Sequence, residues 1–226
     1  MSMRYGNKIG PLVSRKTSFN KKDRFDKNLI KIPSSNFSDT WIRPSDWLTM
    51  PTMTSADEKV ALLAAVYDND SNFVAVLCSG NYTVDWGDGT IDNVAAGVKA
   101  EHVYTYSTLS SIVCTEGYKM AIITITPQSG QSLTSVDLKQ LHSSVAVSMA
   151  SNPVTPILEL IFSCPNHGST LPIFGSTSSV SLCYLSMLRN VVILNVGAVN
   201  SFLNLFYNCQ IVEINDPSPQ RLSHFF

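Results

Sequence analysis

Residues 82–90, YTVDWGDGT, place two aspartates, two glycines and an indole close together. Asp85 and Asp88 suggest a carboxylate pair, but no Ser, Cys or His stands near them in sequence to complete a catalytic or metal site. Glycines permit positive φ, and short Asp side chains accept hydrogen bonds from turn N–H groups, so the stretch favours a tight turn. We expect the indole to lie on the core. The expected structural turn comprises Asp85, Trp86, Gly87, Asp88, Gly89 and Thr90.

Short apolar segments around this turn predict an antiparallel β-domain over residues 54–130. Residues 59–78 hold two apolar runs, which we interpret as a hairpin, although the first run also fits a helix. The break between the runs, D-N-D-S-N, lacks the central Gly and distal Glu of a calcium loop and predicts a plain turn. Further strands are expected at 82–86, 100–106 and 118–126, the last ending before a proline.

Three motifs in order, VDWGDGT, HVYTY at 102–106 and GYKMAIITIT at 117–126, resemble the polycystic-kidney-disease (PKD) type β-sandwich. The resemblance covers about residues 70–127 and implies a structural, often adhesive module without catalysis. It also implies that the histidine of the second motif is packed and bonded to the turn instead of binding a metal. The matching positions outside the turn are His102, Tyr104, Gly117 and Tyr118.

Residues 131–226 alternate short apolar runs with Ser, Asn, Pro and Gly. Runs beginning at 133, 157 and 180 are spaced 24 and 23 residues apart, and spacings of roughly 20–29 residues are typical of leucine-rich-repeat solenoids. SFLNLFYNCQIVEIN at 201–215 resembles one unit of BspA-type leucine-rich repeats, with Phe206, Asn208 and Cys209 in matching places. Because a solenoid needs a cap on its last coil, we expect a partner or further repeats to cover the terminal Phe225 and Phe226.

The N-terminal region, residues 1–53, is a basic arm followed by a Trp-rich lead. Ten of the sixteen Lys and Arg fall within residues 1–43, and residues 1–40 have too little apolar content to build a core, so we expect the arm to become ordered on a partner. Acidic protein surface is favoured over nucleic acid as that partner. The residues expected to anchor the arm are Arg15, Lys16, Lys21, Lys22, Arg24, Lys27, Lys31, Trp41 and Trp47.

Bulk composition excludes several classes of protein. The net charge of −1 provides no global field for nucleic acid or anionic membranes, and no apolar run reaches the roughly 20 residues that a membrane span requires. The N-terminus has no apolar segment of the kind found in secretory signals. Five widely spaced cysteines indicate reduced core thiols and synthesis in a cytosol. No cofactor is expected.

The lead W-x-R-P-x-D-W-L-x-M-P at 41–51, followed by NYTVDWGDG and BspA-like repeats, is similar to structural proteins of tailed bacteriophages. That resemblance implies a virion component such as a fibre, collar or tail appendage, made in the host cytoplasm. Its partners would be other virion proteins, copies of itself and a host-surface receptor or glycan. The lead itself has no chemical meaning that the sequence reveals.

The expected fold is therefore mainly β: an extended arm, a PKD-like antiparallel β-sandwich and a degenerate leucine-rich-repeat-like solenoid. The expected function is a non-enzymatic virion structural protein. A bacterial surface adhesin that binds carbohydrate or protein is the alternative, and the absence of a secretory signal counts against it. A glycan hydrolase would need two carboxylates about 5–10 Å apart in a groove, and acids near the expected solenoid are sparse: Asp137, Glu159, Glu213 and Asp216.

Overall fold

The computed structural model describes residues 42–69, 72–138, 140, 142–144, 156–168 and 187–197, together with the strand Glu213–Asn215. The fold of these residues is mainly β, as the sequence predicts, and none of them belongs to a helix, so none forms a helix that could cross a membrane. The chain divides into two units, residues 1–40 and 41–226. Trp41 and the basic residues of the expected arm lie outside the described residues.

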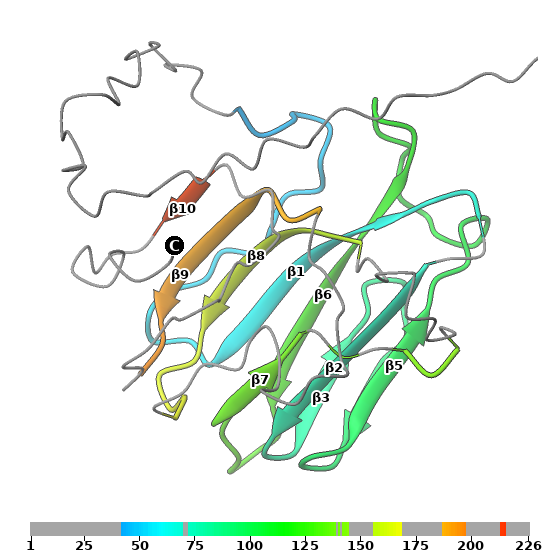
Figure 1. Cartoon of the computed structure of the whole chain (residues 1–226). Coiled ribbons are helices and arrows are strands. Elements are labelled where there is room, and N and C mark those ends of the chain that lie inside the picture. The colour runs from blue at the N-terminus through cyan, green and yellow to red at the C-terminus, as the bar shows by residue number, and fades with distance from the viewer. Residues whose placement is uncertain are drawn as a thin grey trace, which may run out of the picture. The chain divides into compact units, whose positions relative to one another are not determined.

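The larger sheet has seven strands in the order β10-β9-β8-β1-β6-β3-β4 (Figure 1). The strands from β8 through β1, β6 and β3 to β4 are antiparallel to their neighbours, whereas β8, β9 and β10 run parallel to one another. The bounds are β1 Lys59–Val66, β3 Tyr82–Asp85, β4 Ile91–Val94, β6 Lys119–Pro127, β8 Ile157–Ser163, β9 Asn190–Asn195 and β10 Glu213–Asn215.

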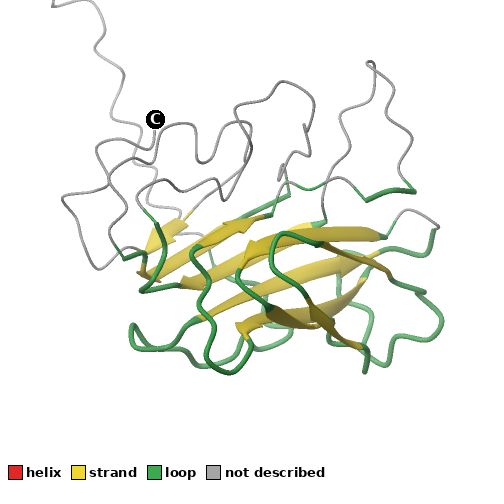
Figure 2. Ribbon diagram, turned by 90° about the horizontal axis from the view of Figure 1, so that it is seen from below, coloured by secondary structure: helices red, strands yellow, loops and turns green. Residues whose placement is uncertain are grey.

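The smaller sheet has three antiparallel strands in the order β5-β2-β7. It forms a second layer beside the larger sheet (Figure 2). One buried cluster holds Val60 and Leu62 of the larger sheet together with Val74 and Val76 of the smaller one. The main core therefore lies between the two sheets. The bounds are β2 Phe73–Ser79, β5 Lys99–Val103 and β7 Ser135–Asp137.

The outer face of the larger sheet carries a second buried cluster. Leu63 and Ala65 of β1 pack there with Met120 of β6, and Trp47 of the lead covers them. Strand β1 is thus buried on both faces, seven of its eight residues being fully buried. Double-sided burial explains why its sequence, KVALLAAV, has no alternation of apolar and polar residues.

The expected hairpin over residues 59–78 is wrong in its pairing, although both strands form. β1 pairs with β6 and β8, whereas β2 pairs with β5 and β7, so the chain crosses from one sheet to the other. Asn72 shapes the crossing: its Oδ1 accepts from the N–H of Tyr67 at 2.8 Å, and its Nδ2 donates to the carbonyls of Tyr67 and Asn69 at 2.8 Å each. The side chain of Asn72 therefore holds the backbone at residues 67 and 69, where the connection begins.

The first of the apolar runs expected to form a solenoid lies in an antiparallel sheet. The run at 133 forms β7, which pairs antiparallel with β2 in the smaller sheet, and is not a coil of a parallel stack. The start of the run expected at 180 lies outside the described residues. The strand that pairs parallel with β8 is β9, in which Asn190 lies opposite Glu159, 31 residues earlier. Because β8 also pairs with β1, the larger sheet runs without a break across the expected boundary at residue 130. The sequence of a short apolar strand does not indicate which other strand it pairs with.

Candidate functional site

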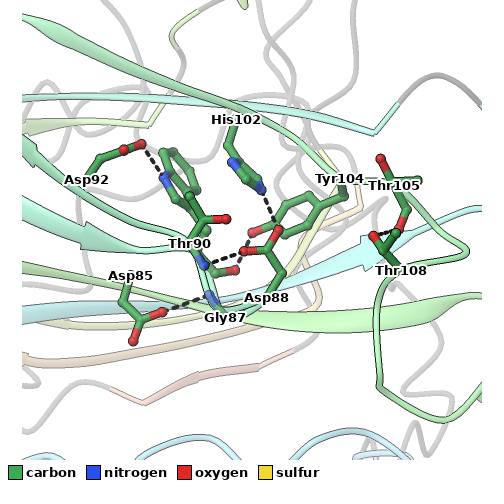
Figure 3. Close-up of polar contacts among 10 residues, drawn as sticks. Asp85, Gly87, Asp88, Thr90, Asp92, His102, Tyr104, Thr105 and Thr108 are labelled. Carbon is green, nitrogen blue, oxygen red and sulfur yellow. Dashed lines mark hydrogen bonds and ion pairs between the residues drawn. The ribbon is translucent and has the colours of Figure 1, made fainter.

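The turn after β3 is held by its own aspartates (Figure 3). The carboxylate of Asp85 accepts a hydrogen bond from the Gly87 N–H at 2.9 Å, and that of Asp88 accepts one from the Thr90 N–H at 2.9 Å. The Trp86 N–H donates to the Thr90 carbonyl at 3.0 Å, which closes the loop between β3 and β4. Each carboxylate therefore bonds a backbone amide two residues ahead, as expected for short aspartate side chains in turns.

The two glycines of the turn have different roles. Both have positive φ, 77° at Gly87 and 96° at Gly89, a region that favours glycine. A Cβ on Gly87 would lie 2.3 Å from the carbonyl oxygen of Ile122 on β6, whereas a Cβ on Gly89 would meet nothing within 4 Å. Gly87 is thus required for the close approach of the turn to β6, and Gly89 for its backbone conformation alone.

Trp86 occupies the core beneath the turn, as the sequence predicts, with no exposed surface. Its indole N–H donates to the carboxylate of Asp92 on β4 at 2.7 Å, and its carbonyl accepts from the hydroxyl of Tyr104 at 2.6 Å. Burial is the chief reason that the pKa of Tyr104 lies well above its usual range, and the charges of Asp88 and Asp85 add to it. The phenol therefore stays protonated and keeps donating to the turn.

His102 bonds to the turn, as the family resemblance implies. Its Nε2 lies 2.7 Å from a carboxylate oxygen of Asp88, and its ring stacks on Trp86 at 4.8 Å with the planes 13° apart. Tyr104 meets the same ring edge-on at 4.6 Å. Partial burial alone would raise the pKa of Asp88, but hydrogen bonds from Thr90 and His102 and the charge of His102 outweigh it and lower that pKa. Asp88 is thus held as a carboxylate.

The remaining two motif residues lie away from the turn. Gly117, with φ of 91°, ends a small loop in which its N–H donates to the Cys114 carbonyl at 2.9 Å. Tyr118 is 2% exposed, as expected for a core residue, but it packs in the outer cluster with Trp47 instead of beneath the turn. Its hydroxyl bonds Glu116. The sandwich-type motifs therefore contribute to both faces of the larger sheet.

The lead does have a chemical role, which the sequence did not reveal. The guanidinium of Arg43 forms hydrogen bonds of 2.8 and 3.0 Å from Nε to the carboxylate of Glu159 on β8, and its Nη2 lies 2.7 Å from the same group. Asn190 of β9 donates to that carboxylate at 3.0 Å. The side chain of Glu159 is only 3% exposed and that of Arg43 is 30% exposed, so a partly exposed guanidinium pairs with a buried carboxylate and joins the lead to the parallel strands.

Two further contacts fasten the lead. A carboxylate oxygen of Asp46 accepts from both the N–H and the hydroxyl of Thr115 at 2.6 Å. Trp47 is 5% exposed and packs in the outer cluster, and Arg43 lies 5.6 Å from the centre of its ring. Spacing along the chain could not have revealed Glu159 as the partner of Arg43, because 116 residues separate them. A lone acid within the apolar run ILELIF was the only available signal.

The aspartates in and beside the turn stabilise its structure. The carboxylates of Asp85, Asp88 and Asp92 each bond a group of the turn or of its indole. Across the described residues, no group of three or more His, Cys, Asp or Glu side chains is placed to hold a metal ion. Comparison of the chain with protein-family models, with curated proteins and with solved structures gives no match.

Proposed function

We propose that the chain is a non-enzymatic structural protein of a tailed-phage virion, in which a basic N-terminal arm attaches it to the particle. In this proposal residues 54–130 form a PKD-like sandwich and the parallel strands belong to a leucine-rich-repeat-like solenoid. Together they project as a fibre, collar or tail appendage. The two-layer arrangement around the WGDG turn supports the first assignment, and the parallel pairing of β8, β9 and β10 supports the second.

The attachment of the lead carries the proposal. Residues 43–47, which follow the arm, are fixed to the outer face of the larger sheet by the Arg43–Glu159 ion pair, the Asp46–Thr115 hydrogen bonds and the packing of Trp47. A load applied to the arm would therefore pass into β8 and β1 in the middle of the sheet. A protein that bears load between a particle and a projecting domain needs such a connection.

The proposal is tested by asking whether purified virions contain the chain. Virions purified on a density gradient from the phage that encodes the chain are analysed by mass spectrometry and labelled with a specific antibody for electron microscopy. We expect the chain in the particles at a fixed copy number, with label on an external appendage. Chain found on the host cell surface and not in particles would contradict the proposal and favour the adhesin.

Catalysis is tested separately. The purified protein is incubated with host surface polysaccharide, and the length of the polysaccharide is followed by size-exclusion chromatography. The proposal expects no change of length, because the carboxylates of the turn are bonded to its backbone and to Trp86. Shortening of the polysaccharide would overturn the non-enzymatic assignment and leave a glycan hydrolase in its place.

A further inference from the structure

Residues 142–144, which we term the latch, lie against the outer face of the smaller sheet. His142 is 8% exposed, and its ring packs on Phe73 of β2 with the ring centres 4.9 Å apart. Ser143 bonds Glu101 of β5 through two contacts of 2.7 Å, from its N–H to one carboxylate oxygen and from its hydroxyl to the other. The latch thus ties the chain that follows β7 to both β2 and β5.

The latch depends on one protonation state of His142. The N–H of Ser144 donates to Nδ1 of His142 at 3.0 Å, so Nδ1 carries no proton and the imidazole is neutral. An imidazolium would carry a proton on Nδ1 and turn this acceptor into a donor that faces another donor. Protonation therefore removes the hydrogen bond within the latch that holds the His142 ring in the position from which it packs on Phe73.

The surroundings also disfavour a charge on His142. Burial lowers the pKa of His142 below its usual value of 6.5; Glu101 opposes this effect, while the positive charges of Lys99 and His102 reinforce it. Glu101 cannot serve as a full counter-ion, because it already bonds Lys99 and Ser143. The groups that act electrostatically on the imidazole are therefore Lys99, Glu101 and His102, all on β5, and the ring that packs on it is the uncharged ring of Phe73.

We propose that residues 142–144 form a pH-sensitive latch, closed on β2 and β5 while His142 is neutral and released when mild acid protonates it. Because the folded-state pKa of His142 is lowered, the latch is fully favoured above the usual value of 6.5 and weakens as the pH falls below it. Release uncovers Phe73 and leaves the core between the sheets intact. This inference does not rest on the proposed function.

Protonation of Glu101 does not release the latch between neutral pH and pH 5. Burial would raise the pKa of Glu101, but the hydrogen bonds from Lys99 and Ser143 outweigh it and lower that pKa to about 2. The carboxylate therefore stays ionised throughout mild acid and keeps its part of the latch. His142 is the group of the latch that changes charge between neutral pH and pH 5.

The test is amide hydrogen exchange of the full-length protein at pH 7.5 and pH 5, corrected for the intrinsic dependence of exchange on pH. In the wild type we expect protection at Ser143 and Ser144 to fall by about tenfold for each unit by which closure lowers the pKa of His142. Amides of β1 and β6 should keep their protection. Unchanged protection of the latch, or equal loss in the latch and the core strands, would overturn the proposal.

His142→Asn is the matched variant, because its Oδ1 stands close to the position of Nδ1 and accepts from Ser144 without titrating. We expect the variant to retain latch protection at pH 5, and loss equal to that of the wild type would contradict the mechanism. Should the variant not fold, NMR titration of the His142 ring in the wild type decides instead. A pKa at or above 6.5 for that ring would overturn the proposal.

Discussion

Both carboxylate oxygens of Asp88 are engaged, one by the Thr90 N–H and the other by His102. We expect Asp88→Ala to lower the free energy of unfolding by about 1–2 kcal/mol, since the amide and the imidazole each lose a charged acceptor. Asp88→Asn keeps an acceptor for the amide and should lose less. Urea denaturation measures both. An Asp88→Ala protein with wild-type stability that has lost an activity or a bound metal would show that the turn is a chemical site.

The glycines of the turn provide a matched pair of substitutions. Gly87→Ala and Gly89→Ala both place a Cβ on a positive-φ residue, which costs about 1–2 kcal/mol. Only the first also brings that Cβ within 2.3 Å of the Ile122 carbonyl oxygen. We therefore expect Gly87→Ala to lower the thermal midpoint clearly more than Gly89→Ala. Equal midpoints in a calorimetric comparison would mean that the turn does not approach β6 this closely.

Glu101 should make stability depend on pH in the acid range. Its pKa is about 2 in the folded protein against a usual 4.5, so its stabilising contribution is complete above pH 4.5 and disappears as the pH falls to about 2. In Glu101→Gln this contribution is absent at every pH. We expect the stability difference between wild type and variant to shrink from pH 5 to pH 2. A constant difference across denaturation curves in that range would contradict the assignment.

The Arg43–Glu159 ion pair joins the lead to β8. Arg43→Met leaves the carboxylate of Glu159 buried with Asn190 as its remaining donor. We expect the free energy of unfolding to fall by about 3 kcal/mol, because an uncompensated buried charge is costly. The double variant Arg43→Met/Glu159→Gln should recover part of that loss. A double variant as unstable as the sum of its two single variants would show that the two side chains do not interact.

The local geometry of the turn could be predicted from sequence, because it is determined within nine residues. Gly87 and Gly89, the short aspartates and the core position of Trp86 all follow from backbone sterics and from the reach of a side chain. The contact of His102 with the turn, in contrast, was implied only by the resemblance to PKD-type domains. Local chemistry thus predicted the interior of the candidate site.

The pairing of strands could not be predicted in the same way. β1 is apolar on both faces, so its pattern fits a hairpin strand, a central strand or a helix equally well. The choice depends on Trp47, which covers the outer face from a segment that precedes β1. Likewise, β7 is short, and nothing within its sequence distinguishes a partner in the smaller sheet from a place in a parallel stack.

The larger sheet contains both antiparallel and parallel strands. β8 provides the junction, because one edge of it pairs antiparallel with β1 and the other pairs parallel with β9. Glu159 lies at this junction and receives Arg43 from the lead. The lead, the antiparallel strands and the parallel strands therefore all contact β8. A substitution that displaces β8 would weaken all three sets of contacts.

Residues 1–40 are the segment that we propose attaches the protein to the particle. The contacts described for the lead begin at Arg43, so a protein starting at Trp41 retains them. We expect this truncated protein to unfold at the same denaturant concentration as the full chain but to fail to enter particles. Full-length attachment should weaken as salt rises, because the arm is basic.

A full-length variant separates charge from length in that experiment. Replacing the arm residues Arg15, Lys16, Lys21, Lys22, Arg24, Lys27 and Lys31 with Gln keeps the length of the chain but removes the positive charges. If charge contacts hold the arm, this variant should enter particles as poorly as the truncated protein, since screening and neutralisation act on the same contacts. Particle assembly is measured by the amount of chain that cosediments with virions. A truncated protein that cosediments as well as the full chain would show that residues 1–40 do not attach it.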